Sequence, residues 1–266
     1  MSDWDALTAE LDRWAAAGAA ATLWWRDDDA GAPDPALDRL LGLARDHGTP
    51  LTLAVIPARA DPALAGLLAD APGVTAVQHG YAHLNHAPDG ERKAELGAHR
   101  PAEIVVAELA VGWDRLQTLL GPRLRPILVP PWNRIAPHLV PMLPELRYAG
   151  LSTFGPRPRA RPTAGLIQAN SHLDIIDWPG HRGFVGTRAA LAALTGHLAA
   201  RRTGAVADPA EPTGLLTHHL AHDHGAWAFI DALLARTRGH PGARWLDAAA
   251  VFQPAPAARA AAGPGR

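Results

Sequence analysis

Short apolar segments alternate with helical patterns along most of this 266-residue chain. Two of the helical patterns follow an Asp N-cap with Pro at the start of the helix, at Asp34-Pro35 and Asp61-Pro62. Strands that alternate with helices predict a parallel sheet with the helices packed outside it. The segments that we expect to form strands are Thr22–Arg26, Leu51–Ile56, Val74–Gln78, Ile127–Val129, Gly150–Phe154, Leu173–Trp178 and Gly214–His218. The expected helices cover residues 3–17, 34–47, the segment after 61, 101–120, 187–201 and 224–236.

Seven strands of this kind predict an α/β fold, a distorted (β/α) barrel with about seven parallel strands. A doubly wound open sheet is the alternative. Its dinucleotide-binding form is not supported, because no G-x-G-x-x-G follows the first strand, and the chain has no P-loop. We expect a single domain over residues 1–252. Residues 253–266 are rich in Ala, Pro, Gly and Arg, and with so few large apolar side chains to pack we expect a disordered tail.

Composition excludes several classes of function. The chain has no cysteine, which rules out a disulfide scaffold, a Cys nucleophile and thiolate metal sites. A net charge of -1 provides no overall positive field, so we expect no nucleic-acid partner. The apolar run Ala15–Trp25 is too short to span a bilayer and has no basic segment before it. We therefore expect no membrane partner, no signal peptide and a cytoplasmic location, and leave the oligomeric state open.

Polar clusters follow several of the expected strands. Because the carboxyl ends of parallel strands meet at one end of a barrel, these clusters should converge in one cleft. Half of the 14 histidines lie in two short windows, 79–86 and 218–224, and both windows begin at such a strand end. The clusters are Asp27-Asp28-Asp29, His79, Pro131-Trp132-Asn133-Arg134, Asp177-Trp178 and His218-His219.

His79 and His83 form an H-x-x-x-H pair that can direct two imidazoles at one divalent metal ion. One carboxylate of the Asp27–Asp29 run would complete a two-His, one-carboxylate set with positions left open for water and substrate. The spacing alone does not tell which Asp is the ligand. His86 could join only if the loop geometry allows it.

His218 and His219 supply a candidate general acid. Side chains alternate between the two faces of a strand, so only one of the two should enter the cleft. A histidine beside a metal ion and a carboxylate can donate a proton to a leaving group at neutral pH. Trp132 and Trp178 can offer flat apolar faces to a ring-shaped ligand, and we place Asn133 and Arg134 with them as candidate substrate-binding residues.

In this order the clusters resemble the motifs of the polysaccharide deacetylase family, the NodB-homology or carbohydrate esterase family 4 group. The resemblance runs from about Trp24 to Leu234. The family's Asp-Asp, H-[ST]-x-x-H, Arg-Pro-aromatic, Asp-Trp and apolar-x-His motifs resemble Asp28-Asp29, His79–His83, Val129–Trp132, Asp177-Trp178 and Leu216–His218.

The resemblance implies a distorted barrel and a role for each matched residue. Asp28 would be the base, and Asp29, His79 and His83 the metal ligands. His218 would be the acid, oriented by Asp177, with Trp178 lining the pocket. Two positions depart from the family: Gly80 stands where Ser or Thr is usual, and Val129 where Arg is usual, so that Arg134 or Arg26 would have to replace that charge.

The expected function is a metal-dependent hydrolase that removes an N-acetyl or other acyl group from an amino-sugar-containing substrate, either a small molecule or an oligosaccharide. Zinc is the expected metal, and Fe, Co, Ni or Mn suit the same ligands. Two alternatives stay open. One is hydrolysis of another non-peptide C–N bond, in a cyclic amide or ureide, on the same scaffold. The other is a non-catalytic sugar-binding relative.

Overall fold

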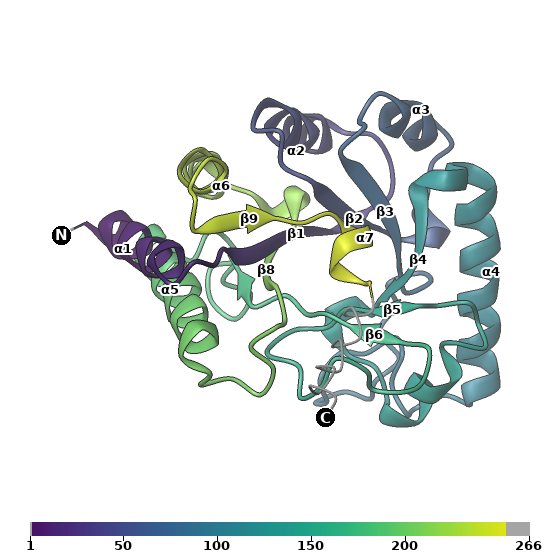
Figure 1. Cartoon of the computed structure of the whole chain (residues 1–266). Coiled ribbons are helices and arrows are strands. Elements are labelled where there is room, and N and C mark those ends of the chain that lie inside the picture. Colours follow the sequence, from purple (N-terminus) through teal and green to yellow (C-terminus); the bar gives the residue numbers. More distant parts are fainter. Residues whose placement is uncertain (1, 254–266) are drawn as a thin grey trace, which may run out of the picture.

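The sheet is built around β1 (Ala21–Ala30), the longest strand of this computed structural model, which describes residues 2–253. β1 pairs with β2, β8 and β9, and every strand pairing is parallel. The strands run in the order β6-β5-β4-β3-β2-β1-β8-β7, with β9 attached to β1 (Figure 1). The remaining strands are β2 (Leu51–Val55), β3 (Val74–His79), β4 (Leu124–Val129), β5 (Gly150–Leu151), β6 (Ile167–Gln168), β7 (Leu173–Asp174), β8 (Thr213–Thr217) and β9 (Ala243–Trp245).

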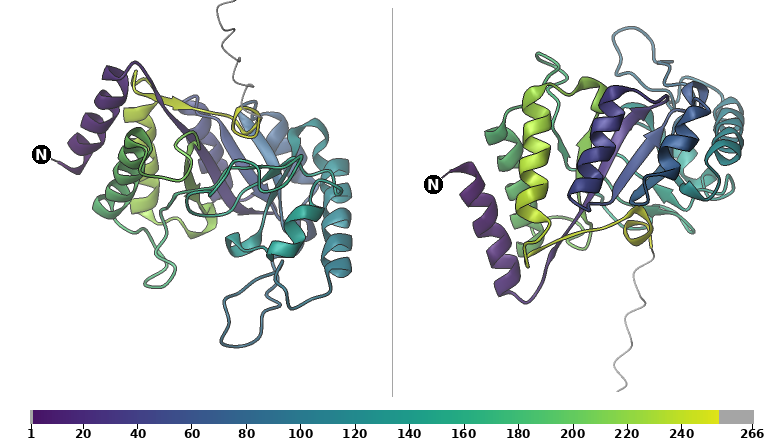
Figure 2. Two further views of the ribbon diagram at one scale, coloured as in Figure 1. Left: turned by 60° about the horizontal axis from the view of Figure 1, so that its bottom comes forward. Right: turned by 90° about the horizontal axis from the view of Figure 1, so that it is seen from above.

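Helices cover the outside of the curved sheet. In Figure 1, α6, α2, α3 and α4 follow one another around it, and Figure 2 shows the same row from above. α1 packs against α5 beside them. The helices are α1 (Asp3–Ala16), α2 (Pro35–Asp46), α3 (Ala63–Ala69), α4 (Ala102–Leu120), α5 (Thr187–Thr203) and α6 (His224–Thr237). The short α7 (Ala248–Val251) is the exception, because it lies inside the curve.

The predicted fold class, a distorted α/β barrel, is confirmed. All seven expected strands are present, and β6 and β9 add two that no periodic pattern indicated, because they are only two and three residues long. Two expected strands are clearly shorter than predicted: β5 ends at Leu151 rather than at Phe154, and β7 ends at Asp174 rather than at Trp178. The chain turns back there, since Ile176 forms an antiparallel bridge with Phe184.

Apolar side chains pack on both faces of the sheet, which explains why its strands read as continuous apolar runs. On β2, Leu53 belongs to the large cluster under the outer helices, whereas its neighbour Ala54 belongs to a small cluster inside the curve. Ala248 of α7 joins this inner cluster, and Phe252 packs against it. α7 therefore fills part of the interior that the curved sheet encloses.

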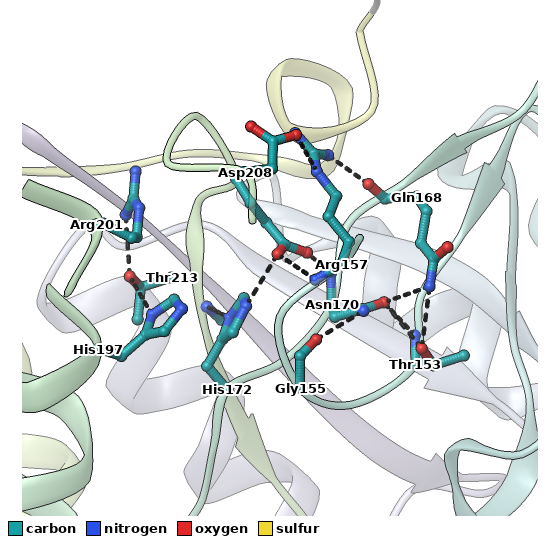
Figure 3. A network of polar contacts seen from close by, with 12 residues as sticks. Thr153, Gly155, Arg157, Gln168, Asn170, His172, His197, Arg201, Asp208 and Thr213 are labelled. Atoms are coloured by element: carbon teal, nitrogen blue, oxygen red, sulfur yellow. Dashed lines mark hydrogen bonds and ion pairs between the residues drawn. The ribbon is translucent and has the colours of Figure 1, made fainter. Parts of the chain in front are cut away.

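A buried polar network closes the gap between β6 and β7, the two ends of the strand order. The carboxylate of Glu211, 1% exposed, accepts hydrogen bonds from the backbone N–H groups of Arg157 (2.8 Å) and Asn170 (2.8 Å). The Asn170 side chain accepts a hydrogen bond from the Thr153 backbone (2.9 Å) and donates to the Gly155 carbonyl (2.7 Å), as Figure 3 shows. Polar contacts thus take the place of a strand ladder at this seam.

No helix within residues 2–253 combines the length and apolar character needed to cross a membrane. The predicted disordered tail lies, except for Gln253, outside the described residues.

The close packing at the seam yields a stability prediction. A Cβ on Gly214 would lie 2.5 Å from the Asn170 carbonyl oxygen and 2.7 Å from the Ser171 Cα. We expect Gly214→Ala to lower the free energy of unfolding by about 1–3 kcal/mol, because backbone atoms must move. The control is Gly196→Ala on α5, where a Cβ would meet nothing within 4 Å. Thermal melting followed by circular dichroism should show a lower Tm for the first variant only, and equal Tm values would contradict this account of the seam.

Candidate active site

Asp29, His79 and His83 meet at the carboxyl ends of β1 and β3. The Asp29 Oδ1 atom lies 3.2 Å from the Nε2 atoms of both histidines, and one ligand atom from each residue lies within 4.8 Å of the others. His79 is the last residue of β3, and His83 follows in a loop with a left-handed backbone, φ 58°. Of the three adjacent aspartates, the structure therefore brings Asp29 to the two histidines.

The protonation states of these groups suit metal binding. His79 Nδ1 lies 2.9 Å from the Val129 carbonyl, which can only accept, so Nδ1 carries the proton and Nε2 faces Asp29. Burial, together with the positive charge of His79, lowers the pKa of His83. Burial opposes ionisation of Asp29, but the neighbouring charge of His79 outweighs it and holds the pKa of Asp29 below the usual range. Burial lowers the pKa of His79, but the charges of Asp28 and Asp29 raise it more, so the net shift is upward. A divalent ion binds an ionised carboxylate and neutral imidazoles, so an ion bound here would take the place of a proton on Nε2 of His79.

The geometry also fits a cation. The buried Oδ1 atom of Asp29 has no hydrogen-bond partner within the described part of the chain, although it faces two imidazole nitrogens. The separation of 3.2 Å is close to the roughly 3.3 Å between two ligands of one tetrahedral zinc ion at the usual bond lengths. His86 is not part of this group.

Asp28 is held by Arg26, its neighbour two residues earlier on β1. Arg26 Nε lies 2.9 Å from Oδ1 of Asp28, and a second guanidinium nitrogen donates to Oδ2 at 3.0 Å. Arg26 also donates to the side chains of Ser152 (2.6 Å) and Asn133 (2.6 Å). Between the two replacements expected for the missing third-motif Arg, the structure selects Arg26. Arg134 points elsewhere and donates to the Lys93 carbonyl at 2.7 Å.

Asp27 and His219 form a buried ion pair separate from the group of Asp29, His79 and His83. Asp27 Oδ2 also accepts hydrogen bonds from the Thr217 hydroxyl (2.6 Å) and the His219 backbone N–H (3.0 Å). His219 Nε2 lies 3.6 Å from Asp34, the N-cap residue of α2. Burial lowers the pKa of His219, but the charge of Asp27 raises it more, so the net shift is upward. His218 and His219 therefore have different partners, as expected, although β8 ends at Thr217 and His219 begins a short 3-10 turn beyond the strand.

His218 lies beside Asp174 rather than Asp177. Its Nδ1 atom is 3.9 Å from Asp174 Oδ1, and its ring meets the Trp178 ring edge-on with centroids 4.7 Å apart. The Trp178 indole N–H donates to Asp174 Oδ2 at 2.9 Å, and burial raises the pKa of Asp174. Asp177 instead pairs with the exposed His181 at 3.0 Å. Because β7 ends at Asp174, the Asp177-Trp178 pair lies in the following turn, and only Trp178 returns to His218.

Trp132 and Asn133 complete the described surroundings. The Trp132 ring packs on the ring of His83, with centroids 4.3 Å apart. Trp132 and Asn133 have left-handed backbones, φ 54° and 58°, which non-glycine residues rarely adopt. The Asn133 side chain accepts a hydrogen bond from Arg26, and it therefore helps to hold the guanidinium that binds Asp28.

The comparisons with known proteins agree with the fold described above. No protein-family model and no curated protein sequence matches the chain. Solved structures do match. A Mycobacterium smegmatis protein assigned as a polysaccharide deacetylase superposes with a TM-score of 0.62 at 17% identity, covering 87% of this chain and 88% of its own. A peptidoglycan N-acetylglucosamine deacetylase gives a TM-score of 0.59 at 17% identity, over 88% and 89%. A family 4 acetyl xylan esterase from Clostridium thermocellum, in complex with a cobalt ion, gives 0.50 at 15% identity, over 87% and 90%.

The chain has the NodB-homology fold. This is the fold of polysaccharide deacetylases and family 4 carbohydrate esterases, and at identities below 20% the similarity concerns the fold alone.

Two contributors to this site were not predicted from the sequence. Asp174 was not predicted because the strand was expected to continue to Trp178, which would place Asp177 rather than Asp174 at its carboxyl end. Glu95 accepts hydrogen bonds from backbone N–H groups of the loop between His79 and His83, beginning with Tyr81 (2.9 Å). It comes from a long irregular segment without motif or periodicity, so no local signal could have identified it.

The ligand geometry yields a binding prediction. We expect purified protein to bind one divalent ion per chain and His83→Ala to lose it, because one of the three ligand atoms disappears. His86→Ala is the matched control, since His86 lies in the same loop but outside the ligand group. Elemental analysis after dialysis, with circular dichroism as a check of folding, measures both variants. Full metal occupancy in His83→Ala would rule out this site.

Proposed function

We propose that this protein is a metal-dependent deacetylase that hydrolyses an N-acetyl group on an amino-sugar-containing substrate. The observation that carries the proposal is the grouping of Asp29, His79 and His83 directly beside Asp28, the chain neighbour of Asp29. A divalent ion held by such a group polarises a carbonyl and lowers the pKa of its water to about 7.

Asp28 is the proposed base. Both of its oxygens face the guanidinium of Arg26, at 2.9 Å and 3.0 Å, so the carboxylate has one orientation in the cleft. Its role is to take the proton of the attacking water. Arg26 supplies the positive charge that the Arg of the third motif provides in the family, and it therefore replaces the Arg that is missing at Val129.

His218 is the proposed acid. It protonates the departing amine as the tetrahedral intermediate collapses, so that the C–N bond breaks to a neutral amine. Asp174, 3.9 Å from Nδ1, orients the ring in place of Asp177. Trp178, 37% exposed and edge-on to His218, offers an apolar face for a sugar ring, with Trp132 as the second candidate platform.

The substrate class rests on similarity and chemistry together. Among the structural neighbours, one is a peptidoglycan N-acetylglucosamine deacetylase and another an acetyl xylan esterase, so both N-acetyl and O-acetyl groups belong in a substrate panel. Cyclic amides and ureides belong there as the alternative C–N substrates. Zinc remains the expected metal, and the esterase with bound cobalt supports including Co²⁺ in reconstitution. The cytoplasmic location also remains a prediction.

Acetate release from acetylated amino sugars by the zinc-loaded protein tests the proposal. We expect His218→Gln and Asp28→Asn each to lower kcat by about 10²–10⁴-fold while retaining metal, because neither is a proposed ligand. Asp28→Asn leaves the buried Arg26 charge unpaired and needs a folding check, so His218→Gln is the cleaner variant. Bound metal and sugar affinity without acetate release would favour the non-catalytic alternative. Loss of metal in Asp28→Asn would mean that Asp28, and not Asp29, is the metal ligand.

A second pair of variants tests which carboxylate orients His218. We expect Asp174→Asn to lower kcat by up to about 100-fold with little change in KM, because the ring loses its charged neighbour and its alignment. Asp177→Asn makes the same chemical change at the exposed residue that pairs with His181, and kcat should stay near that of the unmodified protein. Equal losses in both variants would contradict the assignment to Asp174.

A further inference from the structure

The loop that carries His83 is held by a buried carboxylate that follows 11 to 14 residues after the groups it binds. Glu95 is 0% exposed. Its Oε2 atom accepts a hydrogen bond from the Tyr81 N–H (2.9 Å), and its Oε1 atom accepts from Ala82 (2.8 Å) and Leu84 (3.3 Å). The partners of this buried acid are thus three backbone N–H groups of a single loop, two of which flank His83 directly.

Gly80 makes room for this contact. It has a left-handed backbone, φ 52°, and a Cβ at this position would lie 2.0 Å from Oε2 of Glu95. In the family that the sequence resembles, Ser or Thr is usual here. In this chain a carboxylate from outside the motif occupies the space next to the loop, and the glycine is the residue that permits it.

The segment that delivers Glu95 is anchored on both sides. Before it, the Asn85 side chain accepts hydrogen bonds from the N–H groups of Ala87 (3.1 Å) and Ala94 (3.0 Å). After it, Leu96 forms a parallel bridge with Ile135, just beyond the Trp132–Arg134 segment. Glu95 therefore lies between two anchored residues, Ala94 and Leu96, so its position does not depend on the exposed residues 88–93.

His83 needs such support because of its conformation. A left-handed backbone is unfavourable in a non-glycine residue and persists only where the surroundings hold it. Oε1 of Glu95 accepts from the N–H groups of the residues on either side of His83, so the loop is held both before and after this residue. The Leu84 N–H belongs to the peptide that leaves His83, whose plane helps to set the direction of the histidine. We infer that Glu95 is a positioning residue that holds His83 in place as a metal ligand. This inference rests on the proposed function, in that His83 binds a divalent ion.

The test compares Zn²⁺ affinity of the metal-free full chain and its variants by calorimetric titration. In Glu95→Gln the side chain keeps one acceptor oxygen, while its NH₂ group faces an N–H donor. We expect Zn²⁺ to bind about 10–100-fold more weakly, as is typical when a group that orients a ligand is lost. Glu91→Gln is the matched control in the same segment, because Glu91 is exposed and its charged partner is His99, at 3.6 Å, rather than the His83 loop. Its affinity should equal that of the unmodified protein.

Two further readouts separate positioning from general stability. The visible absorption of the Co²⁺-loaded protein should change in Glu95→Gln and not in Glu91→Gln, because it reports the geometry of the ligands. If Glu95→Gln does not fold, Glu95→Asp retains the charge on a side chain one methylene shorter, and its Zn²⁺ affinity should still fall. A folded Glu95 variant with unchanged affinity and spectrum would overturn this inference alone. Failure of the unmodified protein to bind Zn²⁺ or Co²⁺ would overturn the proposed function and the inference with it.

Discussion

A fully buried guanidinium determines how the strand ends meet. Arg26 lies on the central strand with 0% exposure, and its nitrogens lie between 2.6 and 3.3 Å from oxygens of Asp28, Asn133, Ser152 and Thr153. A buried charge that loses its partner is strongly destabilising, so the segments after β4 and β5 must stay aligned with β1. The contacts that satisfy the charge also hold the proposed base, and stability and function therefore depend on the same interaction.

The three adjacent aspartates can coexist because each has a different partner. Asp27 turns away from the cleft to His219, Asp28 binds Arg26, and Asp29 faces the two histidines. Strict alternation would return Asp29 to the side of Asp27. Its left-handed backbone, φ 75°, and the irregular register between Asp27 and Ala30 redirect it. Further left-handed residues, His83, Trp132 and Asn133, lie at the same site, where surrounding contacts sustain local strain.

Much of the fold could be predicted from the sequence, because short continuous apolar runs and helix-starting dipeptides are local signals. The extent of short segments was harder to predict, since β6 and β9 have too few residues to show a period. At the site, the meeting of Asp29, His79 and His83 follows from the rule that parallel strands share a carboxyl end. Which side chains support them depends on loop paths, for which local patterns carry no signal.

The sequence by itself determined the alternation of strands and helices, the polar clusters at the strand ends and the exclusion of thiolate chemistry, since all three follow from residue type and spacing. Only the tertiary structure decided that Arg26 rather than Arg134 pairs with Asp28, that Asp174 rather than Asp177 approaches His218, and that Glu95 lies beneath the His83 loop. Each choice depends on where a strand ends or a loop returns, and so on distances between side chains in space. Those distances are set by the packing of the whole barrel.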